Sequence, residues 1–233
     1  GKYLEHKDAY KSVFESLSHA SIPANCSLEI VPISPESEAL TNQLSQCDGC
    51  LIPGGFGTRS WEGKIAAARY CRDNNIPCFG ICLGMQALVV EYARYALSLP
   101  LANSLEMDPN TPDPVVCMMQ GQDTMIKGGT MRLGAYPCQI TPKSLAFEAY
   151  KTDLVQERHR HRYEVNPAYV DLLQKNGLRI VGVCPQGDLC EIIEIPNHRW
   201  MLGVQFHPEF LSKLAAPHPL FVKFLSAALD YSL

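Results

Sequence analysis

The sequence lacks long apolar runs and an excess of basic residues. No hydrophobic stretch approaches the roughly 18 residues that a membrane-spanning helix needs, and residues 1–5 carry no signal-peptide core. Lys and Arg number 20 against 24 Asp and Glu, for a formal net charge of −4, so no basic surplus is present to neutralise phosphates. We therefore expect a soluble, cytoplasmic protein that binds neither membranes nor nucleic acid.

The cysteines also lack zinc-site spacing. Ten of them are scattered along the chain, and the one C-x-x-C pair, Cys47 and Cys50, has no second pair at a suitable distance. A metal or redox site at this pair is one interpretation. The simpler one is that Cys50 enters an apolar strand as a small hydrophobic residue, so we expect no metal site.

The first hundred residues alternate between helical and strand patterns, within a chain that is 46% apolar. Such alternation predicts parallel βαβ units whose sheet is covered by helices on both faces. We expect helices at 8–20, 36–45, 61–74 and 83–96, and strands at 28–32, 49–52 and 76–81.

Beyond residue 101 the pattern changes to turn-rich sequence with short strands at 115–119, 180–184, 191–195 and 201–205, and a last helix at 219–229. We predict one α/β domain over residues 1–233, with an open, largely parallel central sheet, helices on both faces and a smaller antiparallel portion. Because no strand precedes the first helix, we expect the domain to be excised from a longer chain.

Cys82 has the sequence context of a nucleophile. It stands between a strand and a helix, with Gly80 and Gly84 two residues to either side, which is the steric pattern of a nucleophile elbow. The start of a helix favours the reactive thiolate. A tight turn whose cysteine only packs is the alternative.

His207 and Glu209 supply the partners that a nucleophilic cysteine needs. In an extended segment, residues two apart face the same side, so the carboxylate could reach the imidazole. Pro208 favours that extended geometry for His207. The pair could take the thiol proton and pass it to a leaving group, and we expect the rate to fall as His207 becomes protonated.

A glycine-rich loop at 53–57 follows the strand at 49–52. Backbone N–H groups of Gly54 and Gly55, together with that of Leu83, could form an oxyanion hole. The alternative is a phosphate loop, but Ile65 stands where a Walker A motif requires Ser or Thr, and the spacing is one residue too long.

Two further features lie near these motifs. Gln86 is four residues after Cys82 and shares its helical face. In residues 157–163 arginines alternate with His159 and His161. These histidines could bind zinc, but no third ligand is evident, so a basic edge that faces a carboxylate or nucleotide is the preferred interpretation.

With these motifs the chain resembles class I (triad) glutamine amidotransferases, and among them the amidotransferase domains of CTP synthases. The resemblance covers nearly the whole chain and is carried by residues 1–3, 8–12, 53–57, 80–86, 128–134, 157–166 and 206–210. It departs from the family at Ser60, where glycine is usual, and between Gln120 and Lys127, which is shorter than expected.

The resemblance implies a flavodoxin-like fold, a Cys82, His207 and Glu209 triad, and glutamine hydrolysis through a glutamyl thioester. Glu106 would pair with the glutamine ammonium and Arg162 with its carboxylate. The complete set of implied glutamine contacts is Gly55, Leu83, Gly84, Met85, Gln86, Glu106 and Arg162.

The resemblance also implies partners outside this chain. Ammonia would pass to a synthetase domain of the same polypeptide, which aminates UTP to CTP with ATP and Mg²⁺ in a homotetramer, while GTP activates the glutaminase step. No cofactor is expected in this domain. The remaining alternatives are another triad amidotransferase, a γ-glutamyl hydrolase, or a catalytically silent regulatory or assembly module.

Overall fold

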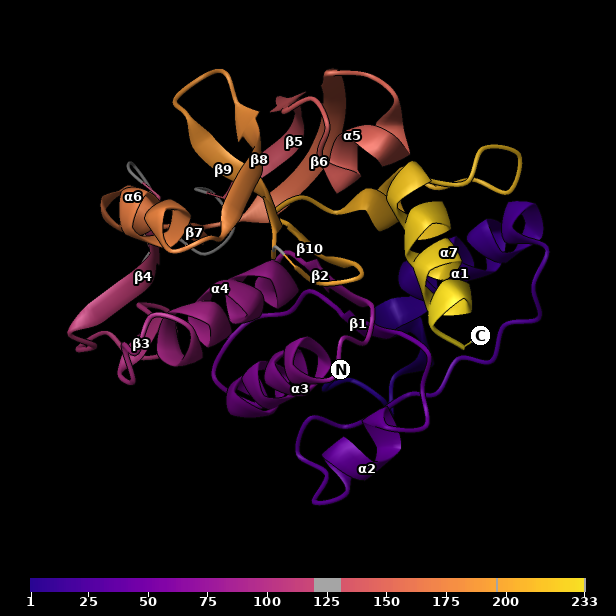
Figure 1. The fold of residues 1–233 in the computed structure, drawn as a ribbon, viewed down its shortest axis with the longest axis horizontal. Helices are drawn as coiled ribbons and strands as arrows, with labels where there is room; N and C mark the ends of the chain where they lie inside the picture. Colours follow the sequence, from indigo (N-terminus) through magenta and orange to yellow (C-terminus); the bar gives the residue numbers. More distant parts are fainter. Residues whose placement is uncertain (120–130, 196, 233) are drawn as a thin grey trace.

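The computed structural model describes residues 1–119, 131–195 and 197–232. Its centre is a seven-stranded sheet in the order β1-β2-β10-β9-β8-β5-β6 (Figure 1). The strands β1, β2 and β10 run parallel, and the remaining neighbours pair antiparallel. Their bounds are β1 (Cys50–Ile52), β2 (Cys78–Ile81), β10 (Met201–Val204), β9 (Leu189–Glu194), β8 (Arg179–Cys184), β5 (Arg132–Ile140) and β6 (Leu154–His161).

A second, three-stranded sheet lies beside the first. It consists of β3 (Ala102–Ser104), β4 (Asp113–Met118) and β7 (Tyr163–Val165), with β4 in the middle. Since β6 and β7 are separated by one residue, Arg162, the chain passes from the large sheet to the small one at that point.

Helices cover both faces of the large sheet (Figure 1). One face carries α3 (Trp61–Asp73) and α4 (Leu83–Tyr95), and the other carries α1 (Lys11–Ala24) and α7 (Pro219–Ser232). Shorter elements complete the chain: η1 (Lys7–Tyr10), α2 (Leu40–Leu44), α5 (Leu145–Tyr150), α6 (Pro167–Lys175) and η2 (Pro208–Phe210).

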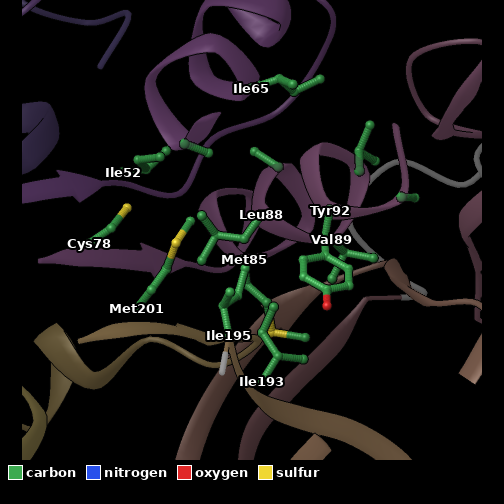
Figure 2. Packing of buried hydrophobic residues seen from close by; sticks show 14 of the residues in the cluster. Ile52, Ile65, Cys78, Met85, Leu88, Val89, Tyr92, Ile193, Ile195 and Met201 are labelled. Carbon is green, nitrogen blue, oxygen red and sulfur yellow. The ribbon is translucent and has the colours of Figure 1, made fainter. Parts of the chain in front are cut away.

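Each helical layer has its own apolar core. Along β2 successive side chains alternate between faces, so Cys78 packs in the α3–α4 core whereas Phe79 and Ile81 pack in the α1–α7 core. Figure 2 shows the first core, where Met85 and Leu88 of α4 pack over the sheet. The predicted α/β fold with helices on both faces is confirmed.

The predicted strand at 28–32 is wrong, because that segment pairs with no strand in the described residues and is held by side-chain packing of Leu28 and Ile30 alone. The helix expected at 36–45 is only the five-residue α2. The antiparallel portion is larger than expected, because among the described strands of the large sheet only the pairs β1–β2 and β2–β10 are parallel, and the antiparallel strands β9, β8, β5 and β6 continue the sheet from β10.

No helix in the described parts of the chain is long and apolar enough to cross a membrane. Of the resemblance motifs, residues 128–130 and the segment 120–127 fall outside the described residues.

Candidate active site

Cys82 forms the turn between β2 and α4. Its backbone has φ 52° and ψ −106°, a conformation that is strained for any residue with a side chain. A Cβ on Gly80 would come within 2.8 Å of the backbone of Gly84, and a Cβ on Gly84 would collide with the carbonyl oxygen of Ile52. The two glycines therefore let strand and helix meet closely enough to make the sharp turn.

His207 follows β10, which is the parallel neighbour of β2. Its Nδ1 lies 2.7 Å from Oε1 of Glu209, its main-chain N–H donates to the carbonyl of Arg158, and its ring stacks on Phe210 with the centroids 4.8 Å apart. The extended geometry expected for 207–209 is wrong, because Pro208–Phe210 forms η2. The carboxylate reaches the imidazole across this turn instead.

Cys82 and His207 face the same loop glycine. A Cβ placed on Gly54 would lie 3.1 Å from Cε1 of His207 and 3.6 Å from Cβ of Cys82. The Nε2 atom of His207 is buried and makes no hydrogen bond with any described residue. The structure thus brings an imidazole nitrogen with a free hydrogen-bonding site to the side of the thiol.

Burial lowers the pKa of His207, but the adjacent Cys82 sulfur and the Glu209 carboxylate outweigh it and raise the pKa to about 10. The imidazole is therefore protonated in the resting protein at neutral pH. A fall in rate from protonation of His207 near its ordinary pKa of 6.5 is not expected from this environment.

The glycine-rich loop after β1 is held by a lysine that sequence reasoning did not select. Lys64 of α3 is almost fully buried, and its Nζ donates to the carbonyl of Pro53 at 2.6 Å. Burial lowers its pKa to about 7. Its place between Trp61 and Ala68 on the buried face of α3 is the sequence signal that could have revealed it, since lysine is rare on such faces.

A small pocket opens beside the nucleophile. Of the predicted glutamine contacts, Gly55, Leu83, Gln86, Glu106 and Arg162 line it. Gly84 and Met85 do not: Gly84 abuts β1, and Met85 packs in the core against Gly203. The lining residues that sequence reasoning missed as contacts are Phe56, His161 and Tyr163.

Two side chains of the pocket, Glu106 and Gln86, already have hydrogen-bond partners within the chain. The Glu106 carboxylate accepts the N–H of Gly57 at 2.8 Å, and burial raises its pKa. Gln86 donates to the carbonyl of Tyr163 at 3.0 Å and to Oε1 of Gln205 at 3.1 Å, while Gln205 points its amide nitrogen at the Cys82 sulfur, 3.8 Å away. Gln86 is thus linked to the nucleophile through Gln205, which the sequence did not single out.

The alternating segment forms β6 and its end. His159 and His161 are buried, while Arg158 and Arg160 are exposed. The two histidines contact each other, Nδ1 to Nε2, at 3.0 Å, and burial lowers their pKa values to about 2 and about 3. They are neutral, and no third His, Cys, Asp or Glu in the described residues joins them in a metal-binding group.

A strained cysteine elbow beside a carboxylate-bound histidine, on an α/β sheet, defines an amidotransferase-like site. The family described as glutamine amidotransferase class-I matches residues 5–227. The chain belongs to this family, and it has the glutamine amidotransferase role that the family defines.

Individual proteins of this family that are highly similar to the chain are CTP synthases. The chain is 80% identical to CTP synthase of Chlamydia trachomatis serovar L2 over 233 residues, which are 100% of this chain and 43% of that protein. It is 64% identical to CTP synthase of Chlamydia pneumoniae over 234 residues, covering 100% of this chain and 44% of that protein. The chain therefore spans less than half the length of these relatives.

Solved structures are similar to it as well, and two of them illustrate this by coverage and TM-score. The Trypanosoma brucei CTPS glutaminase domain with bound acivicin has a TM-score of 0.92 and 39% identity, covering 99% of this chain and 92% of that one. A putative GMP synthase protein from Thermoplasma acidophilum has a TM-score of 0.62 and 14% identity, covering 100% and 92%, and so shares the fold alone.

Proposed function

We propose that this chain hydrolyses L-glutamine to glutamate and ammonia, with Cys82, His207 and Glu209 as its catalytic triad. The observation that carries the proposal is that Cys82 and His207 both flank Gly54, with Nε2 of His207 free of hydrogen bonds to the described residues. Family membership supports the same chemistry.

The Cys82 sulfur attacks as the thiolate, its proton being the one that His207 holds, and a C–S bond to the side-chain amide carbon of glutamine forms as the carbonyl becomes an oxyanion. His207, protonated at rest, gives its proton to the departing nitrogen, so ammonia leaves and a glutamyl thioester remains. The imidazole then takes a proton from the water that attacks the thioester. Cleavage of the C–S bond releases glutamate, whose carboxyl proton passes to solvent, and returns the sulfur as the thiolate beside the imidazolium. Glu209 fixes the imidazole ring and stabilises its charged form.

The oxyanion forms beside the loop that Lys64 holds. Backbone N–H groups of Gly54, Gly55 and Leu83 are the candidate donors, and one donor contributes roughly 2.7–4 kcal/mol in comparable hydrolases. Support comes from the contact between Gly55 and Leu83, because a Cβ on the glycine would meet the leucine side chain at 3.5 Å.

Substrate selection follows from the charges in the pocket. The Glu106 carboxylate is suited to the α-ammonium of glutamine, and the Arg162 guanidinium, whose Nε is buried without a hydrogen bond to the described residues, is suited to the α-carboxylate. The Gly57 N–H occupies only Oε1 of Glu106, so the second carboxylate oxygen can accept from the ammonium while the loop contact holds.

In the full-length protein, the ammonia is used by a synthetase domain that aminates UTP to CTP with ATP and Mg²⁺, as the name of the relatives implies. GTP would activate the glutaminase step, and a cytoplasmic homotetramer is the expected assembly. The high identity to CTP synthases favours this role over another triad amidotransferase, a γ-glutamyl hydrolase or a silent module.

Replacement of the nucleophile tests the proposal. Cys82→Ala in the full-length protein should lower glutamine-dependent ammonia release by at least about 10⁴-fold, in line with other hydrolase nucleophiles, while CTP formation from added ammonium salt persists. Cys26→Ala, at a half-buried cysteine just beyond the end of α1, is the matched control and should release ammonia at the parent rate. Normal glutamine turnover by Cys82→Ala would refute the assignment.

A further inference from the structure

Three cysteines from three different elements meet on the α3 side of the sheet. Their Sγ atoms, in Cys50 of β1, Cys71 of α3 and Cys78 of β2, all lie within 4.8 Å of one another. Cys50 and Cys78 are register partners in the parallel pair β1–β2, so their side chains leave the sheet on one face. Cys71 comes from the helix that covers this face, and Figure 2 shows Cys78 in the same layer as Met201.

The three thiols take no part in the proposed hydrolysis. All are free cysteines, and both Cys71 and Cys78 are completely buried. Metal–sulfur bonds of about 2.3 Å place the sulfurs of a trigonal site about 4.0 Å apart. The observed separations need to contract by less than about 1 Å to reach this geometry, a change that side-chain rotation can supply.

We propose that Cys50, Cys71 and Cys78 bind one monovalent copper ion in trigonal thiolate coordination. Sulfur ligands select soft ions, with copper(I) among the foremost. Structural zinc sites take four ligands, and no fourth His, Cys, Asp or Glu among the described residues joins this group. The set of three sulfurs therefore suits copper(I) better than zinc.

The site has an entry path. Cys50 lines a cavity of about 370 Å³ that runs along the β1 edge of the sheet, and Cys47 and the α3 residues Lys64 and Ala67 line the same cavity. An ion that enters this cavity reaches the cluster through Cys50. Each coordinating thiol releases its proton to solvent when the metal binds.

Copper(I) titration of the full-length, reduced protein under anaerobic conditions tests the proposal, with a chromogenic copper(I) chelator as competitor. Every sample carries Cys82→Ser, so that the nucleophile does not bind the metal. Cys50→Val, which keeps an apolar side chain in β1, and Cys71→Ala should each lose one copper equivalent or bind it at least about 100-fold more weakly, since even outer-shell changes cost 10–100-fold.

Cys117→Ala is the matched control, because this half-buried cysteine lies outside the cluster, and it should bind copper as the parent does. Copper(I) should also raise the thermal unfolding midpoint of the parent and of the control, but not that of the cluster variants. Equal stoichiometry and affinity in all four proteins would overturn the proposal. If Cys71→Ala does not fold, Cys50→Val alone decides it.

Discussion

The protonation of His207 depends on two neighbours, Cys82 and Glu209, which together raise its pKa to about 10 against the effect of burial. Above that pH the neutral imidazole can no longer give a proton to the departing ammonia, so the rate should fall. The ionisation of His207 also affects folding stability. Protonated His207 stabilises the folded state, and this contribution is fully present below pH 6.5, the ordinary pKa of histidine, and is lost as the pH rises through about 10.

Glu209→Gln should move this alkaline limb to lower pH. The amide can still accept a hydrogen bond from Nδ1 but removes a charge 2.7 Å from the ring, and such a charge shifts a pKa by on the order of one unit or more. Ammonia release measured from pH 6 to 11 checks this, with the exposed Glu38→Gln as control. An unchanged limb in Glu209→Gln would show that the carboxylate does not hold the imidazolium.

Cys82, His207 and Glu209 could be proposed from the sequence because their local patterns have physical causes. Two flanking glycines are what a tight turn at Cys82 requires sterically, and a carboxylate two residues from a histidine can pair with it electrostatically. Lys64 and Gln205 were missed because their roles depend on tertiary contacts, with the carbonyl of Pro53 and with the Cys82 sulfur. A lysine is informative only once its helix face is known to be buried, and Gln205 acquires a role only when β10 lies beside β2 and aims its amide at Cys82.

At the scale of elements, the residue before α3, Ser60, has a backbone conformation that is unfavourable for a serine. Ser60 has φ 68°, its side chain is buried, and its hydroxyl makes no hydrogen bond with the described residues. Ser60→Gly should raise the free energy of unfolding by about 1 kcal/mol, because glycine adopts this conformation without strain.

Denaturant unfolding of Ser60→Gly and of Lys143→Gly separates the effect of backbone strain from that of the buried, unpaired hydroxyl. Lys143 has a similar φ of 62° but is exposed, so its substitution relieves only the backbone. A larger gain at position 60 would reflect the unpaired hydroxyl. A loss of stability in Ser60→Gly would contradict the strain argument.

Elements with strong periodicity were predictable, and those that depend on their neighbours were not. The helix after Cys82 was placed closely because its apolar pattern and start signal are local. β5 was missed because Gly134 and Pro137 argue against a strand. Pro137 is tolerated because β5 pairs there with β6 alone, and its pairing with β8 begins at Gln139.

At the scale of the whole molecule, buried histidines should make the fold sensitive to acid. His159 and His161, with pKa values lowered to about 2 and about 3 by burial, bind protons below pH 6.5 only in the unfolded chain. Glu191 acts in the opposite sense, because burial raises its pKa to about 7. At these three groups, the unfolded chain therefore binds more protons than the folded one, so their contribution to stability should fall as the pH is lowered from 6.5 to 4.5.

Two variants should change this slope in opposite directions. His159→Gln removes one of the two protons taken up on unfolding and should flatten the dependence of stability on pH, whereas Glu191→Gln removes the opposing group and should steepen it. Urea unfolding at intervals from pH 4.5 to 7 measures both. Equal slopes in the two variants would contradict this account of the buried polar cluster.

The central claim is that the Cys82 sulfur is the atom that attacks glutamine, and covalent labelling tests it most directly. Treatment with the glutamine-like electrophile diazo-oxonorleucine, followed by peptide mass measurement, should yield one adduct on Cys82. The labelling should slow in the presence of glutamine and be nearly absent in His207→Ala. An unmodified Cys82, or an adduct on another residue at the same rate, would contradict the account.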